Sequence, residues 1–478
     1  MKSSFKLLLT ISIIFVTGLV SYSHPAVNSP ISNHEIIGIW NGSLGGILQM
    51  IFKISSDKSS SLIAELDVPD QLVKSLHLDT VIFDGRNIIL KLNIASAYYE
   101  GKYNPDNISF DGNWHQSGQT FPLSLKKIDK VEGIKHPQEP KPPFPYKVED
   151  VIYENKTAGI KLGGTLTLPV SGEQFTTVLL ITGSGQQNRD EELFGHKPFL
   201  VLADYLTRHG IAVLRVDDRG IGESTGNFAS STTKDFSTDV LASVKYLKNR
   251  NEIDSKRIGL IGHSEGGIIA PMVASETNDV AFIVLMAGSG LPGDEVLYLQ
   301  GEALAKAENI PVERIKRIIE LNRMMYNVIK AGSDSVKIVE QLIKTYSDNY
   351  NSLDEKEKSE IPTPETMFGH GLKSMMSPWF KYFINYDPAP ALEKVKCPVL
   401  ALNGSKDLQV LPTENLAGIK RALEKSGNKN FEVKELPGLN HLFQTAETGN
   451  PSEYAKIEET ISPIALQTIG DWILNITK

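Results

Sequence analysis

One serine of this chain stands in a spacing that suits nucleophilic catalysis. Ser264 lies between Gly262 and Gly266, in the pattern G-x-S-x-G. The apolar run 257–261 precedes this pattern and the small, apolar segment 267–274 follows it, which indicates a strand, a tight turn and a helix. Glycines suit such a turn because they lack side chains, and the helix N-terminus favours negative charge beside the serine hydroxyl. Ser264 is therefore the candidate nucleophile.

A histidine able to activate that serine follows it in the chain. A serine hydroxyl is a poor nucleophile at neutral pH, so it needs an imidazole base and a carboxylate that orients the imidazole. In hydrolases with this turn, the acid and then the histidine follow the serine. Two histidines, His370 and His441, follow Ser264. We predict His441 as the base because it comes directly after a predicted strand, and a surface-loop histidine is the alternative interpretation.

A carboxylate suited to orient His441 follows the preceding strand. Asp407 comes shortly after the apolar run 399–402, in a loop at the end of that strand. The alternative interpretation of Asp407 is a turn or a helix cap, and Asp387 and Glu414 are weaker candidates for the acid. We predict Asp407 as the acid.

Two backbone N–H groups are expected to bind the oxyanion that forms during acyl transfer. The first belongs to Glu265, directly after the nucleophile. The second is expected in the glycine-rich loop 182–186, after the apolar strand 178–181, where we predict Ser184 with Gln186 as the alternative. No lysine of the kind found in phosphate-binding loops follows, so we set aside a nucleotide site.

The segment 148–478 has the alternation of strands and helices that forms a parallel sheet covered by helices. Its predicted strands are continuous apolar runs, as expected when both faces of a sheet are buried: residues 178–181, 211–216, 257–261, 280–286, 399–402 and 431–436. The polar, helix-rich segment 291–392 interrupts the alternation. An insertion at the carboxyl edge of the sheet is placed to cover a site there, so we predict a helical cap.

The segment 31–130 differs, because it carries closely spaced, short strand patterns separated by turn signals. We predict a small antiparallel β domain, a barrel or a sandwich, with an accessory role. Residues 131–147 are rich in proline, which excludes a helix and indicates a semi-rigid linker between the two domains.

The first residues have the pattern of a secretory signal peptide. Lys2 and Lys6 precede the apolar stretch 7–20, and small residues near Ser23 suit a cleavage site. The stretch is shorter than the roughly 20 residues that span a bilayer, so we predict cleavage of residues 1–23 rather than an uncleaved anchor. The mature protein is then expected to be exported, periplasmic or extracellular, without stable membrane insertion.

Charge and composition exclude several classes of protein. The chain has a formal net charge of −8, which argues against nucleic acid as a partner. Cys397 is the one cysteine, so no disulfide can form within the chain, and it precedes a buried-strand pattern as a small core residue does. The histidines are scattered without metal-ligand spacing, so we predict neither a metal nor a cofactor.

Taken together, these motifs resemble the EstD-type esterases of the α/β-hydrolase superfamily, near its serine aminopeptidase-like branch. They occur in the same order over 148–478: residues 182–185 with 188–190, residues 217–224, residues 262–267, residues 403–407, and Asn440 with His441. The resemblance implies the α/β-hydrolase fold and the hydrolysis of carboxylic esters through an acyl-enzyme, without a cofactor.

These expectations combine into an exported serine carboxylesterase that acts on short- to medium-chain esters, with a small-molecule ester as its partner. Ser264, Asp407 and His441 form the expected triad. The N–H groups of Ser184 and Glu265 are expected to bind the oxyanion. Two alternatives stay open, namely a serine aminopeptidase with the same triad and a catalytically idle protein that binds a ligand.

Overall fold

The computed structural model divides into two compact units. It describes residues 31–45, 48–69, 73–116, 119–130, 135–332, 334–359 and 361–478. The first unit consists of Met1–Ile134 with Ser352–Gly371, and the second of Lys135–Asn351 with Leu372–Lys478. The predicted signal peptide, residues 1–23, lies outside the described residues.

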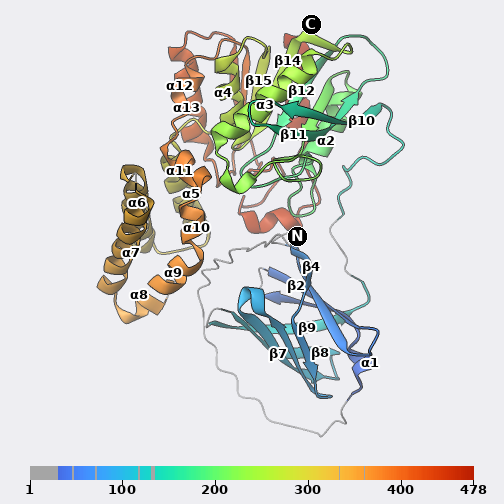
Figure 1. The fold of residues 1–478 in the computed structure, drawn as a ribbon, viewed down its shortest axis with the longest axis vertical. Coiled ribbons are helices and arrows are strands. Elements are labelled where there is room, and N and C mark those ends of the chain that lie inside the picture. Colours follow the sequence, from blue (N-terminus) through green and yellow to red (C-terminus); the bar gives the residue numbers. More distant parts are fainter. Residues whose placement is uncertain are drawn as a thin grey trace. The chain divides into compact units, whose positions relative to one another are not determined.

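The strands of the first unit form one continuous antiparallel sheet (Figure 1). Its order is β4-β3-β2-β1-β9-β8-β7-β6-β5, so most neighbours in the chain are neighbours in the sheet. The predicted antiparallel β domain is confirmed, but its nine strands make a half-barrel rather than a two-sheet sandwich. The strands are β1 (Gly38–Leu44), β2 (Leu48–Ser56), β3 (Leu62–Val68), β4 (Val73–His77), β5 (Thr80–Phe83), β6 (Asn87–Leu92), β7 (Ala97–Asn104), β8 (Ser109–Gln116) and β9 (Gln119–Ile128), with helices α1 (Asn33–Ile36), α8 (Glu355–Ser359) and α9 (Pro364–His370) in the same unit.

Aromatic side chains fill the interior of the first unit. Trp40 is fully buried, packs on Phe110 with ring centroids 4.6 Å apart, and donates its indole N–H to the carbonyl of Ile36 at 2.7 Å. Tyr99 is also fully buried and donates its hydroxyl to the Phe110 carbonyl at 2.8 Å. Polar aromatic atoms in this core therefore have partners, as buried donors require.

The second unit contains a mixed sheet of eight strands that is mostly parallel, as predicted. Its order is β10-β11-β13-β12-β14-β15-β16-β17. Strand β11 pairs antiparallel with β10 and with β13. All the other neighbouring strands in the sheet pair parallel. The strands are β10 (Lys147–Asn155), β11 (Ile160–Leu168), β12 (Phe175–Ile181), β13 (Ala212–Val216), β14 (Ile253–His263), β15 (Phe282–Met286), β16 (Val399–Gly404) and β17 (Phe431–Leu436).

Helices cover both faces of this sheet, because its central strands are apolar on both sides. Along β12, Leu179 and Ile181 face one hydrophobic cluster and Val178 and Leu180 face the other. Helices α3 (Thr233–Lys248), α4 (Gly266–Glu276) and α13 (Pro412–Lys425) close the first cluster, and α2 (Pro198–Arg208) and α14 (Pro463–Ile476) close the second (Figure 1). This layering places the carboxyl ends of the parallel strands at one edge, where ligand sites form in such sheets.

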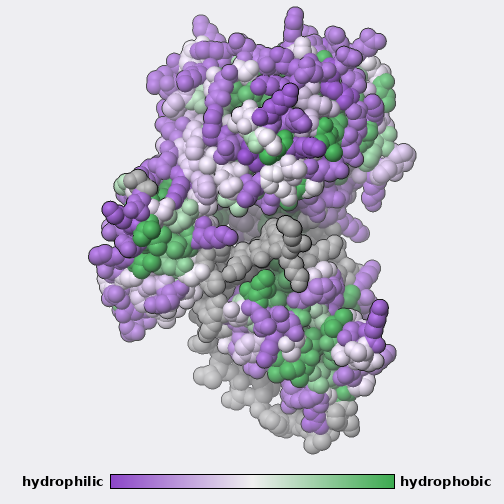
Figure 2. Space-filling view, viewed as in Figure 1, coloured by the Kyte–Doolittle hydropathy of each residue, from purple (hydrophilic) through white to green (hydrophobic). Residues whose placement is uncertain are grey.

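The described residues between β15 and β16 form eight helices, in the interval predicted as an insertion. They are α5 (Gly293–Ala307), α6 (Val312–Ala331), α7 (Ser335–Ser352), α8, α9, α10 (Leu372–Met375), α11 (Pro378–Asn385) and α12 (Ala389–Leu392). Figure 2 shows apolar side chains gathered over α6 and α7, where Val312, Met324, Val336 and Ile343 are exposed. Among the described residues, none of the helices combines the length and apolar character needed to span a bilayer.

The proline-rich segment lies against the second unit. The Gln138 side chain donates to the Ile461 carbonyl at 2.7 Å and accepts from the Thr460 N–H at 2.6 Å. The Tyr146 hydroxyl donates to Asp204 at 2.8 Å. From residue 135 onward, the predicted linker is therefore anchored to the α/β unit by side-chain hydrogen bonds.

Candidate active site

Ser264 occupies a strained turn between β14 and α4. Its φ is +52°, in the left-handed region of backbone conformation that residues other than glycine rarely adopt. A Cβ on Gly262 would meet the Gly266 carbonyl, and a Cβ on Gly266 would meet the Ile181 carbonyl, so both glycines are required by close backbone contacts. The Ser264 N–H donates to the Met286 carbonyl at 2.8 Å, which fastens the turn to β15. Strain of this kind is characteristic of functional sites.

His441 and Asp407 lie together at the ends of the last two strands. The Nδ1–H of His441 donates to Asp407 Oδ2 at 2.8 Å, and both side chains are buried. The other carboxylate oxygen of Asp407 accepts the N–H groups of Gln409 and Val410 at 2.8 and 2.9 Å. Asp407 is thereby held as an oriented acceptor, and it fixes the tautomer of His441 that leaves Nε2 free to act as a base.

A compact turn holds the His441 backbone. The Asn440 side chain is fully buried, and its Oδ1 accepts the N–H groups of Leu442 and Gln444 at 3.0 and 2.9 Å. Its amide nitrogen donates to the Gln444 side chain at 2.9 Å. Asn440 therefore stabilises the turn that holds the His441 backbone.

The glycine-rich loop after β12 passes beside the nucleophile. A Cβ on Gly183 would lie 3.3 Å from the Ser264 Cβ, which is a tight contact, so the loop runs close to Ser264 at this point. The Gly183 N–H donates to the Glu191 carboxylate at 2.7 Å. Within the described part of the chain, the N–H groups of Ser184 and Glu265 have no hydrogen-bond acceptor. Among the described residues, the N–H groups of Gly185 and Gln186 in the same loop also have no acceptor, so Ser184 and Glu265 are among several donors of this region that are available to an oxyanion.

The chain is similar to known serine aminopeptidase-like hydrolases and esterases. The serine aminopeptidase S33 family model matches residues 197–360, a stretch that contains Ser264. Esterase EstD of Thermotoga maritima is 26% identical over 361 residues, which cover 74% of this chain and 76% of that protein. The resemblance to EstD-type esterases is confirmed.

Other similar proteins extend this comparison. An uncharacterized 31.7 kDa protein of Escherichia coli is 25% identical over 49% of this chain and 78% of its own length. The solved structure of Est1E from Butyrivibrio proteoclasticus with bound ferulic acid is 18% identical, with a TM-score of 0.40, over 69% of this chain and 100% of that one. The family model and the similarity to Esterase EstD support a hydrolase with the α/β-hydrolase fold.

The weaker candidates for the acid lie elsewhere in this α/β hydrolase. Asp387 is exposed and accepts the N–H of Ala389 at 2.9 Å, at the start of α12. Glu414 lies in the first turn of α13. The structure brings Asp407, and neither of these, to His441. The side chain of His370 lies outside the described side chains.

Glu265 connects the nucleophile turn of the hydrolase to the inserted helices. Its Oε1 accepts the Thr233 hydroxyl at 2.7 Å and the indole N–H of Trp379, from α11, at 2.8 Å. Burial raises the pKa of the Glu265 carboxyl, and these two hydrogen bonds oppose the shift. The sequence analysis assigned only the backbone N–H of Glu265, and its side chain was missed because Trp379 is 114 positions away.

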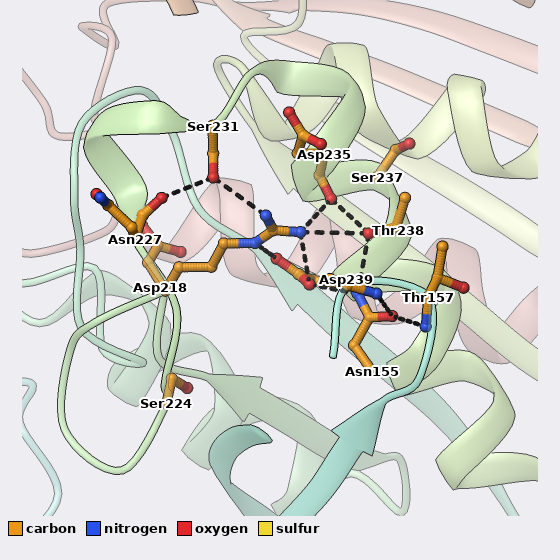
Figure 3. Close-up of polar contacts among 12 residues, drawn as sticks. Asn155, Thr157, Asp218, Ser224, Asn227, Ser231, Asp235, Ser237, Thr238 and Asp239 are labelled. Atoms are coloured by element: carbon orange, nitrogen blue, oxygen red, sulfur yellow. Dashed lines mark hydrogen bonds and ion pairs between the residues drawn. The ribbon is translucent and has the colours of Figure 1, made fainter. Parts of the chain in front are cut away.

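The polar loop after β13 is braced by Arg219 rather than directed at Ser264. The Arg219 guanidinium donates to Asp239 at 2.6 Å, to the Ser231 hydroxyl at 3.1 Å and to the Asp235 carbonyl at 2.8 Å, and Figure 3 shows these contacts. Asn155 of β10 donates to the same Asp239 at 2.6 Å. The loop is therefore fixed to β10 and α3 by a network of charge-assisted bonds.

Asp218, in the loop after β13, holds the glycine-rich loop 182–186 through hydrogen bonds. It accepts the Thr182 hydroxyl at 2.9 Å and the Gln187 N–H at 2.8 Å. Burial raises the pKa of Asp218 to about 7, and the nearby carboxylates of Glu265 and Glu191 add to the rise. Asp218 thus fixes both ends of the loop that carries Ser184.

His263 and Glu191 form a second polar pair that the sequence analysis missed. The His263 ring lies 2.9 Å from a Glu191 carboxylate oxygen through Nδ1 and 2.9 Å from the His441 carbonyl through Nε2. His263 directly precedes Ser264, and only this position in the sequence could have indicated that His263 lies at the candidate site. Glu191 gave none, because its contact with His263 spans 72 positions.

Proposed function

We propose that this hydrolase is an exported serine carboxylesterase, which cleaves short- to medium-chain carboxylic esters through an acyl-enzyme. The observation that carries the proposal is the buried Asp407–His441 hydrogen bond of 2.8 Å, on loops that follow β16 and β17. Its partner in the proposal, Ser264, stands on the strained turn that follows β14. The order of nucleophile, acid and base along the chain is that of α/β hydrolases.

The reaction proceeds in two halves. His441 Nε2 takes the proton of the Ser264 hydroxyl while the serine oxygen attacks the ester carbonyl. Asp407 stabilises the imidazolium that forms, and the N–H groups of Ser184 and Glu265 donate to the oxyanion. His441 then gives the proton to the departing alcohol. Water, activated by the same imidazole, hydrolyses the acyl-enzyme and restores Ser264.

The inserted helices support an ester as substrate. Trp379 reaches the nucleophile turn through its bond to Glu265, and its ring stacks on Phe383 with centroids 5.2 Å apart. Phe380 and Tyr382 extend the aromatic content of α11. Aromatic side chains beside the turn that carries Ser264 suit an acyl chain better than a charged peptide terminus.

An aminopeptidase with the same triad is the second candidate, because the matching family model carries that description. It needs a carboxylate for the free amino group of its substrate. Glu265 is a carboxylate beside the nucleophile, but its Oε1 already accepts bonds from Thr233 and Trp379. The ester proposal therefore requires less rearrangement of the side chains near Ser264.

The two candidates predict opposite preferences. The purified protein is assayed on nitrophenyl esters of increasing acyl length and on aminoacyl anilides, at matched concentrations. We expect the highest kcat/KM for a short- or medium-chain ester. A higher kcat/KM for any aminoacyl anilide would replace the esterase proposal with the aminopeptidase one. N-terminal sequencing of the exported protein tests cleavage near Ser23.

A further inference from the structure

His263 makes contacts that a neutral ring cannot satisfy. Its Nδ1 faces a carboxylate oxygen of Glu191 and its Nε2 faces the carbonyl oxygen of His441, each at 2.9 Å. The carbonyl oxygen only accepts hydrogen bonds, and the Glu191 oxygen likewise only accepts them when its carboxyl group is ionised. A neutral imidazole has a single N–H, whereas the protonated ring has two. The geometry therefore requires a protonated His263 in the arrangement seen here.

Burial makes this charge costly and the Glu191 carboxylate compensates for it. The side chains of His263 and Glu191 are only 7% and 4% exposed. Burial by itself lowers the pKa of His263, but the Glu191 charge, the hydrogen bonds from the ring to Glu191 and to the His441 carbonyl, and the more distant Asp407 together raise it. Removing one member of a buried ion pair leaves the other charge unpaired, which is strongly unfavourable.

The pair touches three segments that the proposed reaction must hold together. Glu191 accepts the Gly183 N–H, at the start of the loop that carries Ser184, from the same oxygen that contacts His263. His263 is the last residue of β14 and is bonded covalently to Ser264. Its other nitrogen holds the backbone carbonyl of His441.

We propose that the His263–Glu191 ion pair is a positioning device for the esterase site. Protonated His263 holds two segments beside Ser264: the loop after β17 that carries His441 and the glycine-rich loop after β12 that carries Ser184. When His263 loses this proton, one of its two hydrogen bonds is lost and the corresponding loop is released. The inference rests on the proposed serine-esterase function. His263 is a positioning residue, because it acts through Gly183 and His441 rather than on the substrate.

The proposal predicts a specific pH dependence of kcat. Three ionisable groups face His263, namely Glu191, His441 and Asp407. As pH rises through the raised pKa of His263, the ring loses one N–H and kcat falls. In Glu191→Gln the amide oxygen can still accept both N–H groups, but the charge is gone. An opposite charge at this range shifts a pKa by about 1 to 3 units, so the alkaline fall of kcat should move down by that amount.

The kinetic test compares Glu191→Gln with the wild type from neutral to alkaline pH on one nitrophenyl ester. Above the shifted pKa we expect a fall in kcat of about 10- to 100-fold with a smaller change in KM, the cost of slight misplacement of reacting groups. Glu191→Asp, which keeps the charge, should restore the alkaline limit in part. Superimposable kcat–pH profiles of Glu191→Gln and the wild type would overturn the proposal.

A matched control carries the same substitution at another ion pair. Glu149 pairs with Arg250 at 2.7 Å. Arg250 precedes the first residue of β14, whereas Ser264 follows its last residue, so the pair lies at the opposite end of this strand. Glu149→Gln removes one charge of a half-buried ion pair and touches none of the residues of the candidate site. It should leave the kcat–pH profile unchanged. An equal shift in this variant would show that the effect of Glu191→Gln is general destabilisation.

The wild-type protein supplies a test that does not depend on folding of a variant. With ¹⁵N-labelled histidine, NMR at about pH 8 should show one ring with both nitrogens protonated, because an unperturbed histidine has a pKa near 6.5. Spectra in which every histidine ring is neutral at that pH contradict the proposal. Labelling of Ser264 by a phosphonate tests the esterase function separately, so the two failures are distinguishable.

Discussion

The two units of this chain bury different kinds of side chain. Among the described residues of the first unit, Asp67 is the one ionisable carboxylate that is buried, and it pairs with Lys53 at the surface. The described part of the second unit buries many charged groups and histidines: Glu191, His196, Arg215, Asp217, Arg219, His263, Glu265, Asp294, Asp407 and His441. Most of them follow the carboxyl ends of the parallel strands.

This difference shows where chemistry is located. A buried charge costs free energy unless it is paired and hydrogen-bonded, so a core that serves stability alone avoids it. The aromatic core around Trp40 follows that rule. The edge of the second sheet instead gathers buried ionisable groups, and such a cluster in one place favours a functional site. The contrast agrees with the proposal that the second unit carries the reactive site and that the first unit has an accessory role.

Loss of the nucleophile gives the largest expected effect. Ser264→Ala should lower kcat by about 10⁴- to 10⁶-fold, because the proposed pathway depends on a covalent intermediate. The circular dichroism spectrum and melting temperature should stay close to those of the wild type. Substantial turnover by this variant would show that the strained turn holds a structural serine.

The two other members of the triad come next. His441→Ala should be nearly as damaging as Ser264→Ala, and Asp407→Asn somewhat less so, because the asparagine side chain favours the wrong tautomer of His441. Steady-state kinetics on a single ester measure both. Asp387→Asn is the matched control, since Asp387 is exposed and accepts the Ala389 N–H rather than a bond from His441. The triad must be redrawn if this control loses more activity than Asp407→Asn.

A core substitution in each unit sharpens the contrast. Trp40→Ala should destabilise the first unit by about 3 to 5 kcal/mol, as expected for a large aromatic side chain removed from a packed core. It should leave kcat of the folded protein unchanged. Trp472→Ala, in α14 against Phe282, is the counterpart in the second unit and should lower the temperature at which activity is lost. Loss of turnover in folded Trp40→Ala would mean that the first unit completes the site.

Acid should affect the second unit through His196. Burial, together with the neighbouring His136, lowers the pKa of His196 to about 4. Between about pH 6.5 and pH 4 the unfolded chain therefore takes up a proton that the folded chain refuses, so stability is lost as pH falls through this window. His196→Gln should show a shallower loss of stability over the same range in chemical denaturation. An identical pH dependence would contradict the assignment.

Sequence patterns were sufficient for features that depend on local order. Apolar runs predicted the parallel strands, and the G-x-S-x-G spacing with residues at strand ends selected Ser264, Asp407 and His441 as candidates. Contacts between distant segments could not be read in this way. The Glu191–His263 pair depends on the pairing of β12 with β14, and the Trp379–Glu265 bond depends on how α11 packs. The half-barrel likewise depends on which strands become edges, which strand patterns do not encode.

The reactivity of Ser264 is the most direct measure of the central claim. The purified protein is treated with a fluorophosphonate and digested, and the adduct is located by mass spectrometry. The account predicts a single adduct on Ser264, its loss in Ser264→Ala, and slow labelling in His441→Ala because the base is missing. An adduct on another residue, or ester turnover that persists while Ser264 stays unlabelled, would contradict it.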